Sequence, residues 1–380
     1  MFVSRVKVYN FRNLADQQVE LLPGAVFITG LNGNGKTNLL EAVYLLSGSR
    51  SFRTNSSSEL ARFGERECSI FGTVVHNDAS MLGGSDRVQH QPGTTEELGL
   101  IFTPGERSAL RNGNSLASIS ELLGSLRAVA FSPSDLQLVK GAPAGRRKFL
   151  DRHMVDLQPS YLQTLMAYQR ALASKSAVLK QQGTGYPQLL PWNELLAEYG
   201  GKIVDNRRMF LESLNERAAS FHAEYAPSDG ALELSLESDL FEDGRSSSEV
   251  VFERLTKAAQ REIAFKSPVE GPHRDDLKLS IGGVDCRSYA SQGQTRSVVL
   301  SMKLGVIDMI ESTTGEAPVV LLDDVDSELD KGRSERLFAA LLAKPRQLIV
   351  TGTAAPTGKL QEISELQVLR VDKGVVSREA

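Results

Sequence analysis

A chain of 380 residues, of which 41% are hydrophobic and 24% charged, can bury a large core, and its length indicates two or three domains or lobes. Its 43 Lys and Arg residues against 47 Asp and Glu leave a net charge of −4, which excludes a globally basic protein and leaves only a local surface for nucleic acid. No apolar run approaches the roughly 18 residues of a membrane-spanning helix. The N-terminus also lacks a signal-peptide core, so we expect a cytoplasmic protein with no membrane partner.

The chain begins with the pattern of three strands and a helix. Apolar and polar residues alternate over residues 2–9 and 18–21, which predicts two strands joined through residues 11–14. The apolar run at 25–29 predicts a third strand. A helix over residues 38–47 should follow, and it carries Leu39, Val43 and Leu46 on one face. We expect that face to pack on the core.

A Gly-rich loop lies between the third strand and this helix. It reads Gly30, Leu31, Asn32, Gly33, Asn34, Gly35, Lys36 and Thr37. The glycines let backbone N–H groups turn toward a phosphate chain, and the helix N-terminus adds its positive dipole end. Lys36 can reach the β- and γ-phosphates, and the Thr37 hydroxyl can ligate Mg²⁺. A purely structural turn is the alternative, but the flanking strand and helix favour a nucleoside-triphosphate site.

The next part of the chain predicts a β-rich lobe. Residues 51–58 are polar and suit a loop near the nucleotide, in which Arg53 contacts phosphate or is simply solvated. Strands are expected at 68–75 and 97–102, separated by a turn at 83–86, and again at 127–131. The segment 132–135 should then cap a helix. Cys68 and Cys286 lie in strand-like stretches and are expected to be buried free thiols.

Beyond residue 145 the chain becomes basic and then helical. Four basic residues fall in the opening turns of a helix: Arg146, Arg147, Lys148 and Arg152. They could meet DNA phosphates or form a solvated helix face, and the sequence leaves both open. Helices over about 159–181 and 191–224 predict an antiparallel hairpin forming an arm or second lobe, with a bundle packed on the sheet as the alternative. A strand at 232–236 and a mobile loop at 238–249 should follow.

Two further motifs indicate how a nucleotide at the phosphate loop would be used. After a hairpin turn at 282–283, the segment Ser291, Gln292, Gly293 and Gln294 leads into a helix over 297–311, so it should offer a second anion-binding helix N-terminus. A buried strand at 319–322 ends in two carboxylates. Asp323 is placed to hold Mg²⁺ and Asp324 to orient the attacking water. Helix capping is the alternative role of this acidic pair.

The order of these motifs resembles an ATP-binding-cassette (ABC) ATPase head. Ser327–Asp330 follows the acidic strand, and a helix and a buried strand then lead to residues 351–353. In such heads the signature segment, here residues 291–294, caps the nucleotide of a second subunit, so dimerisation is part of the mechanism. We therefore expect an α/β fold with a mixed sheet, a β-rich lobe and an inserted helical arm. The expected parts are 1–132 (ATPase lobe), 133–264 (helical arm) and 265–380 (remainder of the ATPase).

Over nearly its whole length the chain also resembles the RecF family of bacterial repair ATPases, which is related to the SMC chromosome proteins. The residues that carry the likeness lie at 11–14, 30–37, 51–53, 131–136, 146–151, 271–275, 291–294 and 322–330. The resemblance implies ATP and Mg²⁺ as cofactors, with Arg12 and Asn13 also at the nucleotide. It implies an ATP-dependent homodimer that binds DNA at gaps and single-strand/double-strand junctions. RecO and RecR are the implied protein partners, and replication, repair and the SOS response the implied processes.

Departures from the cassette pattern suggest slow turnover. Asp324 stands where most cassette ATPases have glutamate, and Thr351 or Thr353 stands near the usual switch histidine. We therefore expect a slow DNA-dependent ATPase. The alternative is a cytoplasmic cassette ATPase that energises a protein or transport complex without touching DNA. His273 has no spaced partner for metal binding, which favours a structural role.

Overall fold

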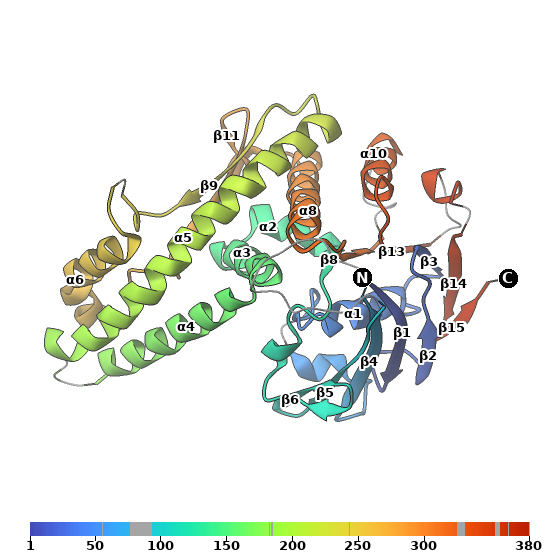
Figure 1. The fold of residues 1–380 in the computed structure, drawn as a ribbon, viewed down its shortest axis with the longest axis horizontal. Coiled ribbons are helices and arrows are strands. Elements are labelled where there is room, and N and C mark those ends of the chain that lie inside the picture. The colour runs from blue at the N-terminus through green and yellow to red at the C-terminus, as the bar shows by residue number, and fades with distance from the viewer. Residues whose placement is uncertain are drawn as a thin grey trace. The chain divides into compact units, whose positions relative to one another are not determined.

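The structure, a computed structural model, divides the chain into two compact units (Figure 1). It describes residues 1–54, 56–76, 93–181, 183, 185–242, 244–324, 331–353, 358–363 and 365–379. The first unit comprises Met1–Leu136, Glu224–Ala226 and Lys303–Ala380, and the second comprises Gln137–Ala223 and Pro227–Met302. Residues 265–302, expected with the C-terminal part of the ATPase, thus make most of their contacts within the second unit. The expected turn at 83–86 and residues 327–330 lie outside the described residues.

The first unit contains a largely parallel sheet of buried strands. Among the described residues its order is β15 (Val375–Arg378), β14 (Gln367–Asp372), β3 (Ala25–Thr29), β13 (Leu348–Gly352), β12 (Val319–Leu322) and β8 (Ala128–Phe131). All neighbours pair in parallel except β14 and β15. Strands β12 and β13 are buried throughout, as expected where both faces of a parallel sheet are covered. Because β3, β13 and β12 are parallel neighbours, their carboxyl ends lie at the same edge of the sheet, which is where ligands bind in such sheets.

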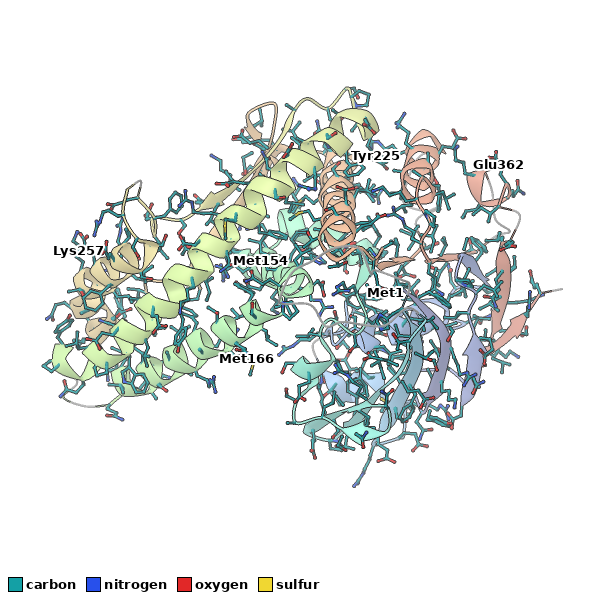
Figure 2. The ribbon with its side chains drawn as sticks, in the orientation of Figure 1. Met1, Met154, Met166, Tyr225, Lys257 and Glu362 are labelled. Carbon is teal, nitrogen blue, oxygen red and sulfur yellow. The ribbon has the colours of Figure 1, made fainter. Side chains whose placement is uncertain are left out.

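A second, antiparallel sheet completes this unit. Its order is β2 (Gln17–Glu20), β1 (Phe2–Tyr9), β4 (Cys68–Val75), β5 (Thr95–Thr103), β6 (Glu106–Arg111) and β7 (Asn114–Ser115). Helix α1 (Lys36–Leu46) contacts strands of both sheets. Leu39, Val43 and Leu46 are buried in the shared core, as their spacing predicts, and Met1, labelled in Figure 2, is buried there too. The β-rich lobe is thereby confirmed, although β6 and β7 were not expected.

The second unit is mainly helical. Its helices are α2 (Leu136–Lys140), α3 (Pro143–Leu157), α4 (Ser160–Leu179), α5 (Tyr186–Tyr225), α6 (Ser247–Phe265), α7 (Cys286–Tyr289) and the first part of α8 (Gln292–Thr314). A small sheet has the order β11 (Val284–Asp285), β10 (Asp276–Ile281) and β9 (Leu232–Glu237). The first unit also contains α10 (Lys331–Leu342) and the 3₁₀ turns Ser57–Leu60, Ile119–Leu122, Pro133–Asp135 and Gly358–Leu360.

The predicted helical hairpin is present as α4 and α5, joined by a short loop (Figure 1). Helix α5 begins before Pro191, which lies inside it. Helix α6 was not predicted, and its first turn occupies the end of the expected loop at 238–249. Leu179, Leu189 and Ala259 form one buried cluster that joins α4, α5 and α6. In this unit Met154 of α3 is buried and Met166 of α4 is exposed (Figure 2).

Both cysteines are free and buried, as expected. Cys68 opens β4, whereas Cys286 opens the short helix α7 and not a strand. Burial raises the pKa of the Cys68 thiol to about 12 and that of Cys286 to about 11. In the described part of the chain, none of the helices has the length and apolar character needed to span a membrane.

Candidate nucleotide-binding site

The predicted strand, loop and helix around the Gly-rich motif are confirmed. β3 ends at Thr29, and α1 begins at Lys36 with Gly35 as its N-cap. Gly30 and Gly35 have φ angles of 146° and 113°, a region that favours glycine. A Cβ atom at Gly30 would lie 2.3 Å from Val371 O, and one at Gly35 would lie 2.8 Å from Asn13 Oδ1. The loop conformation thus requires glycine at both positions.

Lys36 lies inside this loop and is only 7% exposed. Its Nζ donates hydrogen bonds to Gly30 O at 2.6 Å and Leu31 O at 3.2 Å. Burial lowers the pKa of this ammonium, and the charges of Asp324 and Asp323 oppose that shift. The ammonium is therefore held within the curve of the loop. A bound phosphate chain would accept its hydrogen bonds in place of the two carbonyls.

Thr37, the last residue of the motif, meets the acidic end of β12. Thr37 Oγ1 donates to Asp323 Oδ1 at 2.8 Å, and Thr351 Oγ1 donates to the same oxygen at 2.9 Å. Asp323 is 6% exposed, and burial raises the pKa of its carboxyl while the two hydroxyl donors oppose the rise. A hydroxyl and a carboxylate brought together in this way are oxygen ligands of the kind that Mg²⁺ prefers, so these residues fit the predicted ion.

Asp324 lies directly after this pair in an unusual backbone conformation. Its φ angle is 52°, and its backbone N–H donates to Thr351 Oγ1 at 2.9 Å. The Thr351 hydroxyl therefore bonds to both acidic residues. Of the two threonines considered for the switch position, Thr351 is the one beside the acidic pair, while Thr353 is exposed.

Asn13 supports the loop from the connection between β1 and β2. Its Nδ2 donates to Gly33 O at 2.7 Å, and its Oδ1 accepts from Asn38 Nδ2 at 2.5 Å. Asn34 fixes the other side of the loop, because its side-chain amide donates to Val371 O at 3.2 Å. Leu31 and Asn32, at the tip, are exposed.

Arg12 points to a buried carboxylate of α1. Its Nε and Nη2 donate to the two oxygens of Glu41 at 3.0 and 2.8 Å, and its Nη1 donates to Glu59 O at 2.8 Å. Glu41 is 0% exposed, and it also accepts from the Ser51 hydroxyl. Arg53 lies 3.7 Å from Glu41 and donates to Asn38 Oδ1. Sequence reasoning missed Glu41, whose only signal was an acidic residue among the apolar residues of the helix.

The signature segment caps helix α8. Gln294 N donates to Ser291 Oγ at 3.1 Å, and Ser291 N donates to Gln294 Oε1 at 3.0 Å, which is a reciprocal capping box. The helix begins at Gln292, earlier than the predicted Ser297, so Gly293 falls in its first turn. Ser291 and Gln292 are exposed. An exposed helix N-terminus is the feature predicted for this segment.

The basic cluster on α3 differs from the predicted DNA surface. Arg146 is 2% exposed, and its Nε and Nη2 hold the Asp276 carboxylate at 2.6 and 2.7 Å, so its assignment as a DNA contact is wrong. Arg147 is partly buried and donates to Asp275 O at 2.7 Å. Arg152 pairs with Asp156 at 3.0 Å. Only Lys148 of the four basic residues is exposed.

A buried polar network surrounds the segment 271–275. Arg207, 3% exposed, donates to Asp151, to Pro272 O at 2.6 Å and to Asp275 Oδ2 at 3.2 Å. His273 Nδ1 lies 2.6 Å from the Tyr168 hydroxyl, and burial lowers the pKa of His273 to about 4. His273 is thus a neutral packing residue, in line with the structural role favoured for it.

Comparison with known proteins places these features in one group. The family model described as the RecF/RecN/SMC N-terminal domain matches residues 2–376. The DNA replication and repair protein RecF of Caldanaerobacter subterraneus subsp. tengcongensis is 36% identical over 353 residues, covering 90% of this chain and 92% of that protein.

Solved structures agree with this match. The structure of the recombination mediator protein RecF with ATP, from the RecFOR pathway, has a TM-score of 0.88 at 33% identity and covers 100% of this chain and 98% of that one. An Smc head bound to the C-terminal winged-helix domain of ScpA has a TM-score of 0.56 at 15% identity, with 100% and 98% coverage, and supports the fold alone. The predicted fold class, an ABC-type ATPase head with a mixed sheet, a β-rich lobe and a helical insertion, is confirmed.

Proposed function

Because this chain belongs to the RecF family of DNA replication and repair proteins, we propose that it is an ATP-dependent DNA-binding protein of recombinational repair. In this proposal it dimerises on ATP, binds gapped DNA and single-strand/double-strand junctions, and helps to load the recombinase. It supports replication and the SOS response in the cytoplasm. The observation that carries the proposal is the contact between Thr37 and Asp323, which joins the phosphate loop to the acidic strand end within one unit.

The nucleotide is held by the loop and the residues that brace it. The backbone of residues 30–35 surrounds the phosphates, Lys36 neutralises the β- and γ-phosphates, and Asn13 keeps the loop in place. Thr37 and Asp323 would hold Mg²⁺, which neutralises charge on the phosphate oxygens when bound. Asp324 orients the attacking water. Its carboxylate is on a shorter side chain than glutamate, which supports slow hydrolysis. The proposed dependence of that hydrolysis on DNA rests on the family, whose members are DNA replication and repair proteins.

The exposed signature segment supports the proposed dimerisation. In the proposed dimer, residues 291–294 of one subunit cap the γ-phosphate held by the loop of the other, because a helix N-terminus attracts negative charge. ADP lacks that phosphate and should not support the dimer. ATP binding thereby becomes the signal for DNA engagement, with RecR and RecO as the proposed partners that act on the bound complex.

Two observations guide the choice of DNA contacts. Lys148 is exposed and Arg147 is only partly buried, so both stay in the proposal. Arg53 already donates to Asn38 Oδ1, and its contact with phosphate stays a proposal beside that hydrogen bond. A dimer doubles any such surface, so DNA affinity should rise with ATP and fall steeply with salt.

Sedimentation with ATP and with ADP, followed by binding to gapped and blunt duplexes, tests the proposal. We expect a dimer only with ATP, and tighter binding to gapped DNA in that state. Ser291→Arg should leave ATP binding by the monomer intact and block dimerisation, because the long side chain fills the phosphate position. A dimer for both proteins, or for neither, would refute the role of the signature segment. ATP-driven dimers without DNA affinity would favour a cassette ATPase that serves a protein or transport complex.

A further inference from the structure

Lys140, the last residue of α2, holds the chain that leads into the signature segment. Its Nζ donates to Cys286 O at 2.9 Å, Arg287 O at 3.1 Å and Ala290 O at 2.7 Å. A lysine ammonium has three N–H donors, so all three are used on backbone carbonyls. These carbonyls belong to the short helix α7 and to Ala290, the residue directly before Ser291.

This arrangement is not that of an ordinary surface lysine. Lys140 is an exposed residue, and exposed lysines usually leave the ammonium in water because ordering four methylene groups costs conformational entropy. Here the cation instead contacts two carbonyls of a one-turn helix and that of its C-cap residue, Ala290, groups that a helix so short leaves largely without partners of its own. Asp285 caps the opposite end of the same helix by accepting from Ser288 N at 2.9 Å. Helix α7 is therefore fixed at both ends.

Arg146 in turn fixes the helix that carries Lys140. Its Nη1 donates to the carbonyls of Leu138, Val139 and Gly141 at 3.3, 3.2 and 3.0 Å, which lie at the end of α2. Its other donors hold Asp276, the first residue of β10. Strand β10 continues through β11 into α7. Arg146 therefore links the start of this β-hairpin to α2, and Lys140 links the segment that follows the hairpin to the same helix.

We infer that Lys140 is a positioning residue for the ATP site of the dimer. By fixing Ala290 it sets the place and direction of the Ser291 cap, and with them the first turn of α8 that the partner's nucleotide meets. Arg146 sets the position of α2 from which Lys140 acts. The inference rests on the proposed function, because the signature segment is taken to act on the nucleotide of a second subunit.

The test uses Lys140→Met, which keeps the aliphatic stem and removes the three donors. ATP affinity of the monomer should equal that of the wild type, since the phosphate loop belongs to the other compact unit. Dimerisation with ATP should weaken at least about tenfold, because three charge-assisted hydrogen bonds are lost. Lys140→Arg should restore most of it. Lys180→Met, which removes the same charge from an exposed site at the end of α4, should dimerise like the wild type.

A mixing experiment tests whether Lys140→Met impairs only the signature segment or the folding of the whole subunit. In a mixed dimer of Lys140→Met with Lys36→Ala, one composite site joins the intact loop of the first chain to the intact signature segment of the second. ATP turnover should therefore exceed that of either variant alone. Lys140→Met mixed with Ser291→Arg should show no recovery above Lys140→Met alone, because neither chain supplies an intact signature segment.

The outcomes are distinguishable. Normal dimerisation of Lys140→Met, a loss of its monomer ATP affinity, or a failure of Lys36→Ala to restore turnover would each overturn the inference. A wild-type protein that stays monomeric with ATP would refute the proposed function, and this inference with it, before any variant is compared.

Discussion

The ion pair between Arg12 and Glu41 makes the most quantitative prediction for the nucleotide-binding unit. Glu41 is 0% exposed, and Arg12 supplies one donor to each of its oxygens. Arg12→Ala would leave this carboxylate buried without its main partner, a change that costs about 3–5 kcal/mol. The Ser51 hydroxyl and Arg53, 3.7 Å away, still face Glu41, so we expect the lower end, about 3 kcal/mol.

Backbone strain does not alter this figure. Arg12 has a φ angle of 53°, which is unfavourable for alanine as well as for arginine, so the cost is the same before and after the substitution. Replacing the carboxylate as well should recover much of the loss, because Glu41→Gln leaves no buried charge to satisfy. The double variant Arg12→Ala with Glu41→Gln is therefore the matched control.

Thermal unfolding followed by circular dichroism measures the effect. A loss of about 3 kcal/mol should lower the midpoint of a unit of this size by roughly 6–12 °C. Trp192 of α5 is the only tryptophan in the chain and lies in the second unit, so its fluorescence reports separately on that unit. An Arg12→Ala protein as stable as the wild type but deficient in ATP binding would refute this reasoning, and would make Arg12 a nucleotide contact.

Three further predictions concern the site and the buried network. Lys36→Ala should abolish ATP binding or at least hydrolysis, because it removes the only side-chain cation of the phosphate loop; unchanged affinity and turnover would refute the site assignment. Asp324→Asn should bind ATP and stop hydrolysing it, since the charge that orients water is lost, and single-turnover kinetics would expose any other residue in that role. The pKa of His273 is lowered to about 4 from 6.5, so the folded state binds fewer protons than the unfolded state between these values. Neutral His273 therefore contributes at most about 3 kcal/mol to the free energy of unfolding above pH 6.5, and this contribution is lost as the pH falls toward 4. His273→Gln should flatten the dependence of this free energy on pH, measured by urea unfolding over that range.

The sequence predicted those strands, helices and loops that are determined by residues close together in the chain. The phosphate loop was found because its glycines, Lys36 and Thr37 are contiguous, and α1 because its apolar spacing repeats over one face. Strands β12 and β13 were found because both are short apolar runs. Each of these signals lies within a few residues of sequence.

The features that were missed depend on distant partners. Arg146 appeared to be part of an exposed basic run, but its partner Asp276 lies 130 residues away in the sequence. The pairing of Glu41 with Arg12 and the choice of Thr351 over Thr353 likewise follow from tertiary packing. Helix α6 was hidden by the serines and acidic residues at its start, although Val251, Leu255 and Ala259 repeat every four residues along its buried face.

The burial of the two cysteines bears on the conditions in which the protein can work. A thiol reacts with oxidants mainly as the thiolate, and with pKa values of about 12 and about 11 almost none of either thiol is ionised at neutral pH. Oxidants that damage DNA create the need for repair at the same moment that they attack exposed sulfur. Because both thiols are shielded, the chain should be spared cysteine oxidation in such an episode, and a cysteine introduced on its surface would be its one readily oxidised thiol.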